Sequence, residues 1–561
     1  MERIWLKSYP QGVPAEADIH AFRSLVEMFD RCVAEYGTRT AFISMGTRLS
    51  YRDLDRLSAQ FGAWLQQVAR LQAGARVAVM MPNLLQYPIC VCGTLRAGGV
   101  VVNCNPLYTP RELEHQLIDA GAEAIVVAET CAWAVQEVLA RTQVKHVIVT
   151  SVGEMLHMPR ALLVDFVVRR VRRMVKPYRI PGANSLRGAL SRGRSATFKP
   201  ADPSPDDIAF LQYTGGTTGV PKGAMLTHGN LVANVEQSCA WFKPVMRPGQ
   251  EMGLTPLPMY HIFALELTLL FFRIGAPNVV VIDPRNLPAL IAELRRYKIT
   301  AMGAVNTLYN ALANHPDLAN VDFSALRLCV SGGMATHRAV AERWHKVSGR
   351  PIIEAYGLTE TSPAATCNRL DIEEYSGTIG LPLPSTLVAM RDDDGKDVPI
   401  GERGELCISG PQVMKGYWNR PEETAKTMTP DGFVRTGDIA VMDEQGYIRI
   451  VDRKKDMIIV SGFNIFPSEI EQVVSMLPGV LDVGAVGVPD EVSGEAVMIF
   501  VIKRDQSLTK AAVILHCRQN LTGYKVPRHV AFADDLPRTT VGKILRRALR
   551  EMAATWVDPD A

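Results

Sequence analysis

The densest group of potential ligand-binding residues lies between Thr214 and Gly223, in the sequence Thr-Gly-Gly-Thr-Thr-Gly-Val-Pro-Lys-Gly. Glycines let a backbone turn tightly and bring its N–H groups up to an anion. The threonine hydroxyls add further donors, and Lys222 adds a positive charge. This composition predicts a phosphate-binding loop, although a flexible glycine–threonine turn is the alternative. The loop contains no Gly-Lys-Ser/Thr triplet, which excludes a P-loop NTPase.

Four further motifs follow the loop in a fixed order. They are Tyr356-Gly-Leu-Thr-Glu360, Thr436-Gly-Asp438, Asp452-Arg-Lys-Lys-Asp456 and Pro537-Arg-Thr-Thr-Val-Gly-Lys543. In this order the set resembles the adenylate-forming enzymes, which include acyl-CoA synthetases, luciferases and the adenylation domains of peptide synthetases. The resemblance covers nearly the whole chain. The segment Asp431–Glu471, together with Met81–Pro88 and Asn105–His115, is similar to bacterial long-chain fatty-acid–CoA ligases.

The resemblance implies two reactions in one site. A fatty-acid carboxylate attacks the α-phosphate of ATP, with Mg²⁺ as cofactor, and CoA then displaces AMP to give the thioester. Positioned cations and N–H donors are needed, because an anionic nucleophile approaches a polyanion. Three alternatives stay open: an acyl-AMP ligase that supplies a carrier protein, a ligase for medium-chain or aromatic acids, and a silent lipid- or nucleotide-binding protein. Relatives of the first kind carry an insertion near the small domain, whereas Val451–Ile465 runs straight through.

The resemblance assigns the catalytic roles to Lys543, Glu360 and Thr214. Lys543 matches the lysine that reaches the carboxylate and the α-phosphate during adenylation, a task that suits an ammonium point charge. Glu360 matches the magnesium carboxylate, with Thr214 beside it. The predicted contacts to the β- and γ-phosphates are Thr214, Gly215, Gly216, Thr217, Thr218, Gly219 and Lys222.

The remaining nucleotide and CoA contacts follow from the same resemblance. Gly332 and Gly333 come after an apolar run and are expected at the adenine edge, since glycines at a strand end permit the close approach of a flat ligand. The other predicted contacts are Tyr356 and Gly357 at adenine, Thr359 at phosphate, Asp438 and Arg453 at the ribose hydroxyls, and Gly462 on the path of CoA. The hinge between a large and a small domain maps to Lys455, where many relatives carry aspartate.

The acyl pocket is expected in the stretch Pro256–Leu265. Tyr260 and His261 are predicted to line it, and Leu265 stands where some long-chain relatives have a gating tryptophan. The same apolar residues could instead belong to the core.

The elements that must position these residues have an α/β pattern. Apolar runs at 76–81, 99–103, 124–128 and 208–213 predict buried strands, and helical patterns follow Ser50 and cover 110–120. This rhythm predicts a large N-terminal domain with parallel sheets. From residue 456 onward the elements are short, which predicts a small α+β domain. The predicted domains are therefore 1–452 and 453–561, with the hinge near 452–456.

The composition sets further limits. A chain of 561 residues is too long for one core, and a net charge of +3 argues against nucleic acid as a partner. The ten cysteines show no disulfide-like spacing, and the histidines show no zinc-binding spacing. No apolar run is long enough to span a bilayer, since 267–282 is interrupted by Arg273, Gly275 and Pro277. A cytoplasmic protein is expected, with a homodimer as one possible state.

One segment suggests contact with a membrane surface. Between Asp165 and Arg179, apolar residues alternate with Arg169, Arg170, Arg172 and Arg173 at helical spacing. Such a basic amphipathic helix could lie on the anionic inner face of a membrane. The alternative is a surface helix that packs on its own domain.

Overall fold

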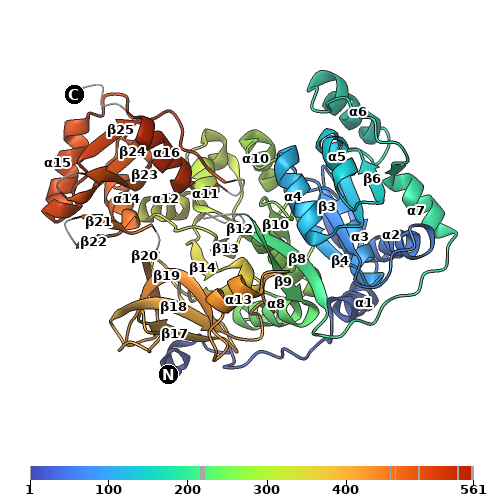
Figure 1. The fold of residues 1–561 in the computed structure, drawn as a ribbon, viewed down its shortest axis with the longest axis horizontal. Coiled ribbons are helices and arrows are strands. Elements are labelled where there is room, and N and C mark those ends of the chain that lie inside the picture. Colours follow the sequence, from blue (N-terminus) through green and yellow to red (C-terminus); the bar gives the residue numbers. More distant parts are fainter. Residues whose placement is uncertain are drawn as a thin grey trace.

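The computed structural model of the chain describes residues 2–214, 221–454, 456–460, 463–490, 493–539 and 542–556. Within these residues the strands form four sheets, and a smaller C-terminal domain lies at one end of the molecule (Figure 1). The predicted α/β fold, with parallel sheets in the large N-terminal part, is confirmed.

The first sheet ends in the hairpin that carries the predicted phosphate loop. Its strands, in spatial order, are β7 Asn184–Ser185, β6 His146–Thr150, β5 Ala124–Ala128, β3 Arg76–Met80, β4 Val100–Asn103, β8 Ile208–Thr214 and β9 Lys222–Thr227. Neighbouring strands are parallel except β8 and β9. Val77 and Val79 face one core cluster, whereas Ala78 and Met80 face another on the opposite side. Burial on both faces explains the near-continuous apolar sequence.

The second sheet supplies the strand ends that form the centre of the site. Its strands, in spatial order, are β16 Leu381–Pro382, β15 Ala364–Cys367, β14 Ile353–Gly357, β13 Leu328–Ser331, β12 Ala301–Ala304, β10 Gly253–Thr255, β11 Asn278–Val280, β1 Thr40–Ser44 and β2 Thr47–Ser50. The strands from β14 to β1 are parallel, and the edges are antiparallel. Open parallel sheets bind ligands beyond the carboxyl ends of their strands.

The third sheet is antiparallel throughout. Its strands are β17 Leu387–Arg391, β18 Arg403–Ser409, β19 Val434–Met442 and β20 Ile448–Arg453. The helices of the N-terminal part are α1 Leu25–Tyr36, α2 Tyr51–Ala63, α3 Gln86–Arg96, α4 Pro110–Ala120, α5 Ala132–Val138, α6 Arg160–Phe166, α7 Leu186–Arg194, α8 His228–Phe242, α9 Ile262–Arg273, α10 Leu287–Arg296, α11 Asn306–Ala313, α12 Arg338–Ser348 and α13 Pro421–Thr427.

The C-terminal domain has its own sheet and core. Its strands are β21 Ile458–Val460, β22 Phe463–Ile465, β23 Val480–Asp490, β24 Gly494–Lys503 and β25 His529–Phe532, and its helices are α14 Pro467–Ser475, α15 Lys510–Asn520 and α16 Arg546–Thr555. Ile470, Val483 and Ile499 pack in a cluster whose members all come from this domain. Figure 1 shows this domain beside β20, α11 and α12.

The predicted helix over 165–179 is wrong in its extent. Helix α6 begins at Arg160, widens into a π-type turn at Val167–Val171 and ends there. Arg173 has a φ of +49°, which a continuing helix cannot accommodate. Pro177 also disfavours helical backbone at the residue before it. Residues 173–180 therefore leave the helix without regular structure.

Candidate functional site

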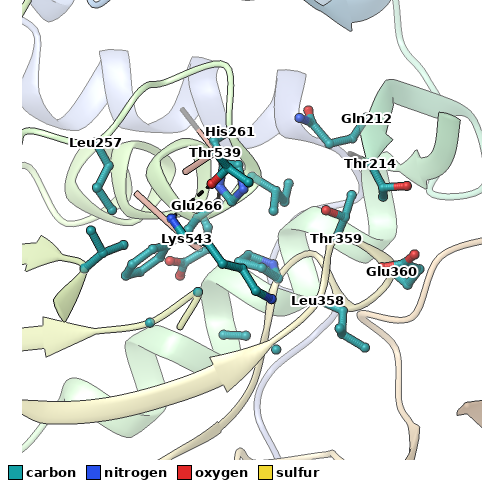
Figure 2. Close-up of a pocket in the computed structure, with 18 of the residues that line it drawn as sticks. Gln212, Thr214, Leu257, His261, Glu266, Leu358, Thr359, Glu360, Thr539 and Lys543 are labelled. Atoms are coloured by element: carbon teal, nitrogen blue, oxygen red, sulfur yellow. Dashed lines mark hydrogen bonds between the residues drawn. The ribbon is translucent and has the colours of Figure 1, made fainter. Parts of the chain in front are cut away.

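A cavity of about 680 Å³ lies at the ends of β8, β13 and β14. It brings together most of the predicted site residues that the structure describes: Thr214, Lys222, Tyr260, His261, Gly332, Gly333, Tyr356, Gly357, Thr359, Glu360, Arg453 and Lys543. Figure 2 shows Thr214, Thr359 and Glu360 on one side of the cavity, with His261 and Lys543 on the other. The predicted residues Gly215, Gly216, Thr217, Thr218, Gly219, Lys455 and Gly462 lie outside the described residues.

The phosphate end of the cavity is built on the hairpin of β8 and β9. Thr214 and Lys222 are direct partners in its antiparallel ladder, so both ends of the predicted loop are held at one point. The Lys222 ammonium forms an ion pair with Glu423 and lies 5.2 Å from the centre of the Tyr417 ring. A cation is thus placed at the base of the loop, where a polyphosphate would need one.

Glu360 follows β14 in a short 3₁₀ turn, Thr359–Thr361. Its Oε1 accepts a hydrogen bond of 2.5 Å from the Tyr417 hydroxyl, which fixes the carboxylate at the cavity wall. In the described part of the chain, no three His, Cys, Asp or Glu side chains form a metal-binding group. One carboxylate with the Thr214 and Thr359 hydroxyls nearby fits Mg²⁺, which takes most of its ligands from phosphate oxygens and water.

The pair predicted to bind the ribose hydroxyls is brought together by strand register. Asp438 of β19 lies directly opposite Arg453 of β20, and Arg453 Nε is 3.0 Å from Asp438 Oδ1. The Tyr356 hydroxyl donates to Asp438 Oδ2 at 2.5 Å. Asp438 is only 3% exposed and does not itself line the cavity, whereas its partners Tyr356 and Arg453 do.

The end of β13 leaves room for a flat ligand. Gly332 follows this strand, and a Cβ on it would lie 3.3 Å from the Ala355 carbonyl oxygen and the Phe263 ring. Gly333 has a φ of +78°, a conformation that favours glycine. Both glycines line the cavity, so the backbone borders it there without side chains, which suits the predicted adenine contact.

Lys543 enters the cavity on a turn of the C-terminal domain. Thr539 N–H donates to the Lys543 carbonyl at 2.7 Å, and Lys543 N–H donates to Thr539 Oγ1 at 3.1 Å. A Cβ on Gly542, whose φ is +85°, would come within 2.5 Å of Thr307 Oγ1, so the turn packs tightly on α11. Burial and the nearby Arg453 charge lower the pKa of Lys543 to about 8.

The predicted acyl stretch, Pro256–Leu265, runs into the start of helix α9. His261 caps this helix, with its Nδ1 accepting from Phe263 N–H at 3.4 Å, and burial lowers its pKa to about 4. Leu265 does not line the main cavity, in contrast to the prediction. It lies in a separate apolar cavity of about 50 Å³, because α9 turns it toward α1 and α3.

The acyl end of the cavity is mostly apolar and includes residues that sequence reasoning missed. Its lining residues include Ser238, Phe242, Leu257, Glu266, Leu267, Val330, Cys367 and Leu383. Burial raises the pKa of the Cys367 thiol well above its ordinary value. The sequence could have indicated Glu266 in one way only, because it is an acidic residue within the largely apolar helix Ile262–Arg273.

Arg546 holds a buried ion-pair network that the sequence does not predict, because arginines near a chain end are usually solvated. Its guanidinium donates to Glu471 at 3.0 and 2.8 Å and lies 3.4 Å from Asp452 and from Asp456. Asp452 and Asp456 are 3% and 7% exposed, so both aspartates are buried despite their charge. This network ties α16, just after Lys543, to the segment predicted as the hinge.

Comparison with known proteins agrees with this geometry. The family model described as AMP-binding enzyme matches residues 29–418, and that described as AMP-binding enzyme C-terminal domain matches residues 469–543. A long-chain-fatty-acid–CoA ligase of Yersinia pestis is 53% identical over 98% of both chains. One of Escherichia coli O6:H1 is 52% identical over 100% of both. ATP-bound MatB of Rhodopseudomonas palustris has a TM-score of 0.81 and 28% identity, covering 94% of this chain and 99% of that chain.

Proposed function

Because this chain belongs to the AMP-binding enzyme family, we propose that it is an ATP-dependent long-chain fatty-acid–CoA ligase. It converts a fatty acid to acyl-AMP with release of pyrophosphate, and then to acyl-CoA with release of AMP. The observation that carries this proposal is one continuous cavity. Lys543, Glu360 and Thr214 line it together with an apolar end formed by residues such as Phe242 and Leu267.

In the first reaction, Lys543 holds the fatty-acid carboxylate against the α-phosphate. The carboxylate and the triphosphate are both anions, and their repulsion is the main barrier to the reaction. The Lys543 ammonium lowers this barrier by neutralising charge that develops on the reacting oxygens. Lys222 and the loop after Thr214 hold the β- and γ-phosphates. Asp438 and Arg453 hold the ribose, and the glycines after β13 admit adenine. Mg²⁺ held by Glu360 beside Thr214 would offset phosphate charge.

In the second reaction, a thiol must approach the acyl carbon from the region where Lys543 lies. We assign the domains as 1–452 and 453–561, with a hinge near 452–456 that turns at Lys455. Rotation of the small domain withdraws Lys543 and brings Gly462 to the path of CoA. Movement of this type is a hinge transition around a fixed site.

A substrate panel tests the proposed function. Acids from acetate to octadecanoate, together with aromatic acids, are incubated with ATP, Mg²⁺ and CoA, and pyrophosphate and acyl-CoA are measured. Long-chain acids are expected to give the highest kcat/KM. Acyl-AMP without thioester would favour the acyl-AMP ligase, and a preference for shorter or aromatic acids would contradict the long-chain assignment.

The pH dependence of the first reaction is expected to report Lys543. Because the pKa of Lys543 is lowered to about 8, its ammonium is present below that pH and is lost above it. The kcat/KM for ATP, followed by pyrophosphate release, should therefore fall as pH rises through about 8. Lys543→Arg keeps its charge at every pH in this range, so its profile should stay flat at a lower rate. The same fall in this variant would assign the titration to another group.

We further propose that α6 and the chain after it bind the surface of an anionic membrane. Leu162, Leu163 and Phe166 are 62%, 62% and 59% exposed, and Arg170 and the arginines at 172 and 173 are exposed beside them. Among the described residues, each helix is too short or too polar to cross a bilayer. Apolar side chains flanked by arginines suit a peripheral position at anionic headgroups.

Binding to vesicles tests the membrane contact. Changing Arg170, Arg172 and Arg173 to glutamate should abolish co-sedimentation with anionic vesicles and leave the activity on dispersed substrate unchanged. Arg169 is kept, because it lies 2.7 Å from the buried Glu129 and anchors the helix. Undiminished binding of the variant, or equal binding to neutral vesicles, would contradict the electrostatic contact.

A further inference from the structure

The acyl end of the cavity contains a buried carboxyl group that the two reactions do not use. Glu266 lies on α9 and is 4% exposed, yet it lines the cavity. Its Oε1 has no hydrogen-bond partner among the residues that the structure describes. A buried polar atom in this state is rare in a folded protein and costs free energy unless something satisfies it.

Glu266 is accompanied by a second buried polar residue, Ser238. It lies on the neighbouring helix α8, is 2% exposed and lines the same cavity. Burial raises the pKa of the Glu266 carboxyl to about 7, and the nearby Ser238 side chain opposes this rise. Two polar side chains from two helices thus meet at the cavity wall.

The rest of this region is apolar. Phe242, Leu267, Cys367 and Leu383 line the same end of the cavity, and each would suit an unsubstituted hydrocarbon chain. Glu266 lies in the second turn of α9, and His261 is the residue that caps the start of this helix. The Glu266 carboxyl shares the cavity wall with these apolar side chains, which suit an acyl chain.

We infer that Glu266 and Ser238 form a polar subsite for a hydroxyl group carried on the acyl chain of the substrate. This inference rests on the proposed function. A hydroxyl can donate to the Glu266 carboxylate or accept from the protonated acid, and its remaining capacity can be met by Ser238. The chain on either side of the hydroxyl packs on the apolar lining. The preferred substrate class is then a hydroxy fatty acid rather than a plain one.

An amino group fits this place less well than a hydroxyl. An ammonium in an apolar pocket needs several acceptors to replace its lost hydration, and one carboxyl with one serine hydroxyl does not supply them. A neutral hydroxyl needs only the two partners that are present. Polar sites of this kind discriminate strongly, because a substrate without the matching group leaves the protein atoms unpaired.

The experiment compares hexadecanoic acid with a positional series of its monohydroxy derivatives, and includes amino derivatives at the same positions. The kcat/KM for acyl-CoA formation is measured for the wild type, Glu266→Leu, Glu266→Gln and Ser238→Ala. At least one hydroxy isomer is expected to surpass the plain acid with the wild type. Glu266→Leu should lower that ratio by about 10- to 100-fold, through loss of the hydroxy acid and gain of the plain acid. Glu266→Gln should keep most of the preference.

Thr268→Val is the matched control, because Thr268 lies on the same helix but lines the separate apolar cavity. In this variant the ratio of kcat/KM for the hydroxy acid to that for the plain acid should equal the wild-type ratio. A ratio that Glu266→Leu leaves unchanged, or a preference for the amino derivatives, would overturn the subsite. Failure of every fatty acid to give acyl-CoA would instead overturn the proposed function. If a variant loses turnover, its affinity for the hydroxy acid is measured by calorimetry and compared with that of the wild type.

Discussion

Replacement of Lys543 by alanine is expected to slow acyl-AMP formation by about a thousandfold or more, whereas supplied acyl-AMP and CoA should still give thioester at close to the wild-type rate. Removal of one preorganised donor at developing charge costs on the order of 10²–10³ in rate, and a full charge between two anions costs more. The turn that holds Lys543 is built from the Thr539 backbone and hydroxyl, so truncation of the side chain leaves it in place.

The two half-reactions are measured separately, by pyrophosphate release and by thioester formation from synthetic acyl-AMP. Arg547→Ala is the matched control, since Arg547 is a nearby positive side chain that is 70% exposed. It should leave both rates unchanged. An equal loss of both half-reactions in Lys543→Ala would contradict the assignment of Lys543 to the first reaction alone, and with it the proposed rotation.

Asp438→Asn is expected to lower kcat/KM for ATP by about 100-fold or more, through a higher KM. The substitution keeps the shape but replaces the charged acceptor with a neutral amide, and a hydrogen bond to a charged group contributes about 1.5–3 kcal/mol. Arg453 is partly exposed and can bind water when its partner is neutral, so the main loss is expected in ATP binding and not in folding. The ribose hydroxyls also lose an acceptor that takes two hydrogen bonds.

Steady-state kinetics with varied ATP, and calorimetric titration of ATP, measure the effect. Asp393→Asn provides the control, because Asp393 pairs with Lys454 next to the predicted hinge but its side chain is 88% exposed. An exposed pair contributes little, so ATP binding should not change. A normal KM for ATP in Asp438→Asn would place the ribose elsewhere.

The elements with strong local signals could be predicted from the sequence. Helix α4 begins and ends where predicted, because Thr109 and Glu112 form a capping box, Pro110 stands in the first turn and Gly121 adopts the left-handed conformation after the last residue. The family prediction is confirmed by the two family models. By contrast, the end of the helix after Val171 depends on the backbone at Arg173, which side-chain periodicity does not reveal.

The contacts that hold the site residues are non-local and could not be predicted. Tyr417 fixes Glu360, and Glu423 pairs with Lys222 from about 200 residues away in sequence. Glu266 could be seen in the sequence, but only the packing of α8 against α9 places Ser238 beside it. The domain boundary, the hinge at Lys455, the cytoplasmic location and the possible homodimer stay predictions.

Cys367 has a consequence for the fate of the activated acyl group. Acyl-AMP is a mixed anhydride that reacts with any nearby thiolate, and Cys367 lines the cavity in which it forms. Burial raises the pKa of this thiol, which disfavours the thiolate that would attack the anhydride. The same apolar wall that would accommodate a hydrocarbon chain therefore also lowers the reactivity of the enzyme's own thiol toward the activated acyl group.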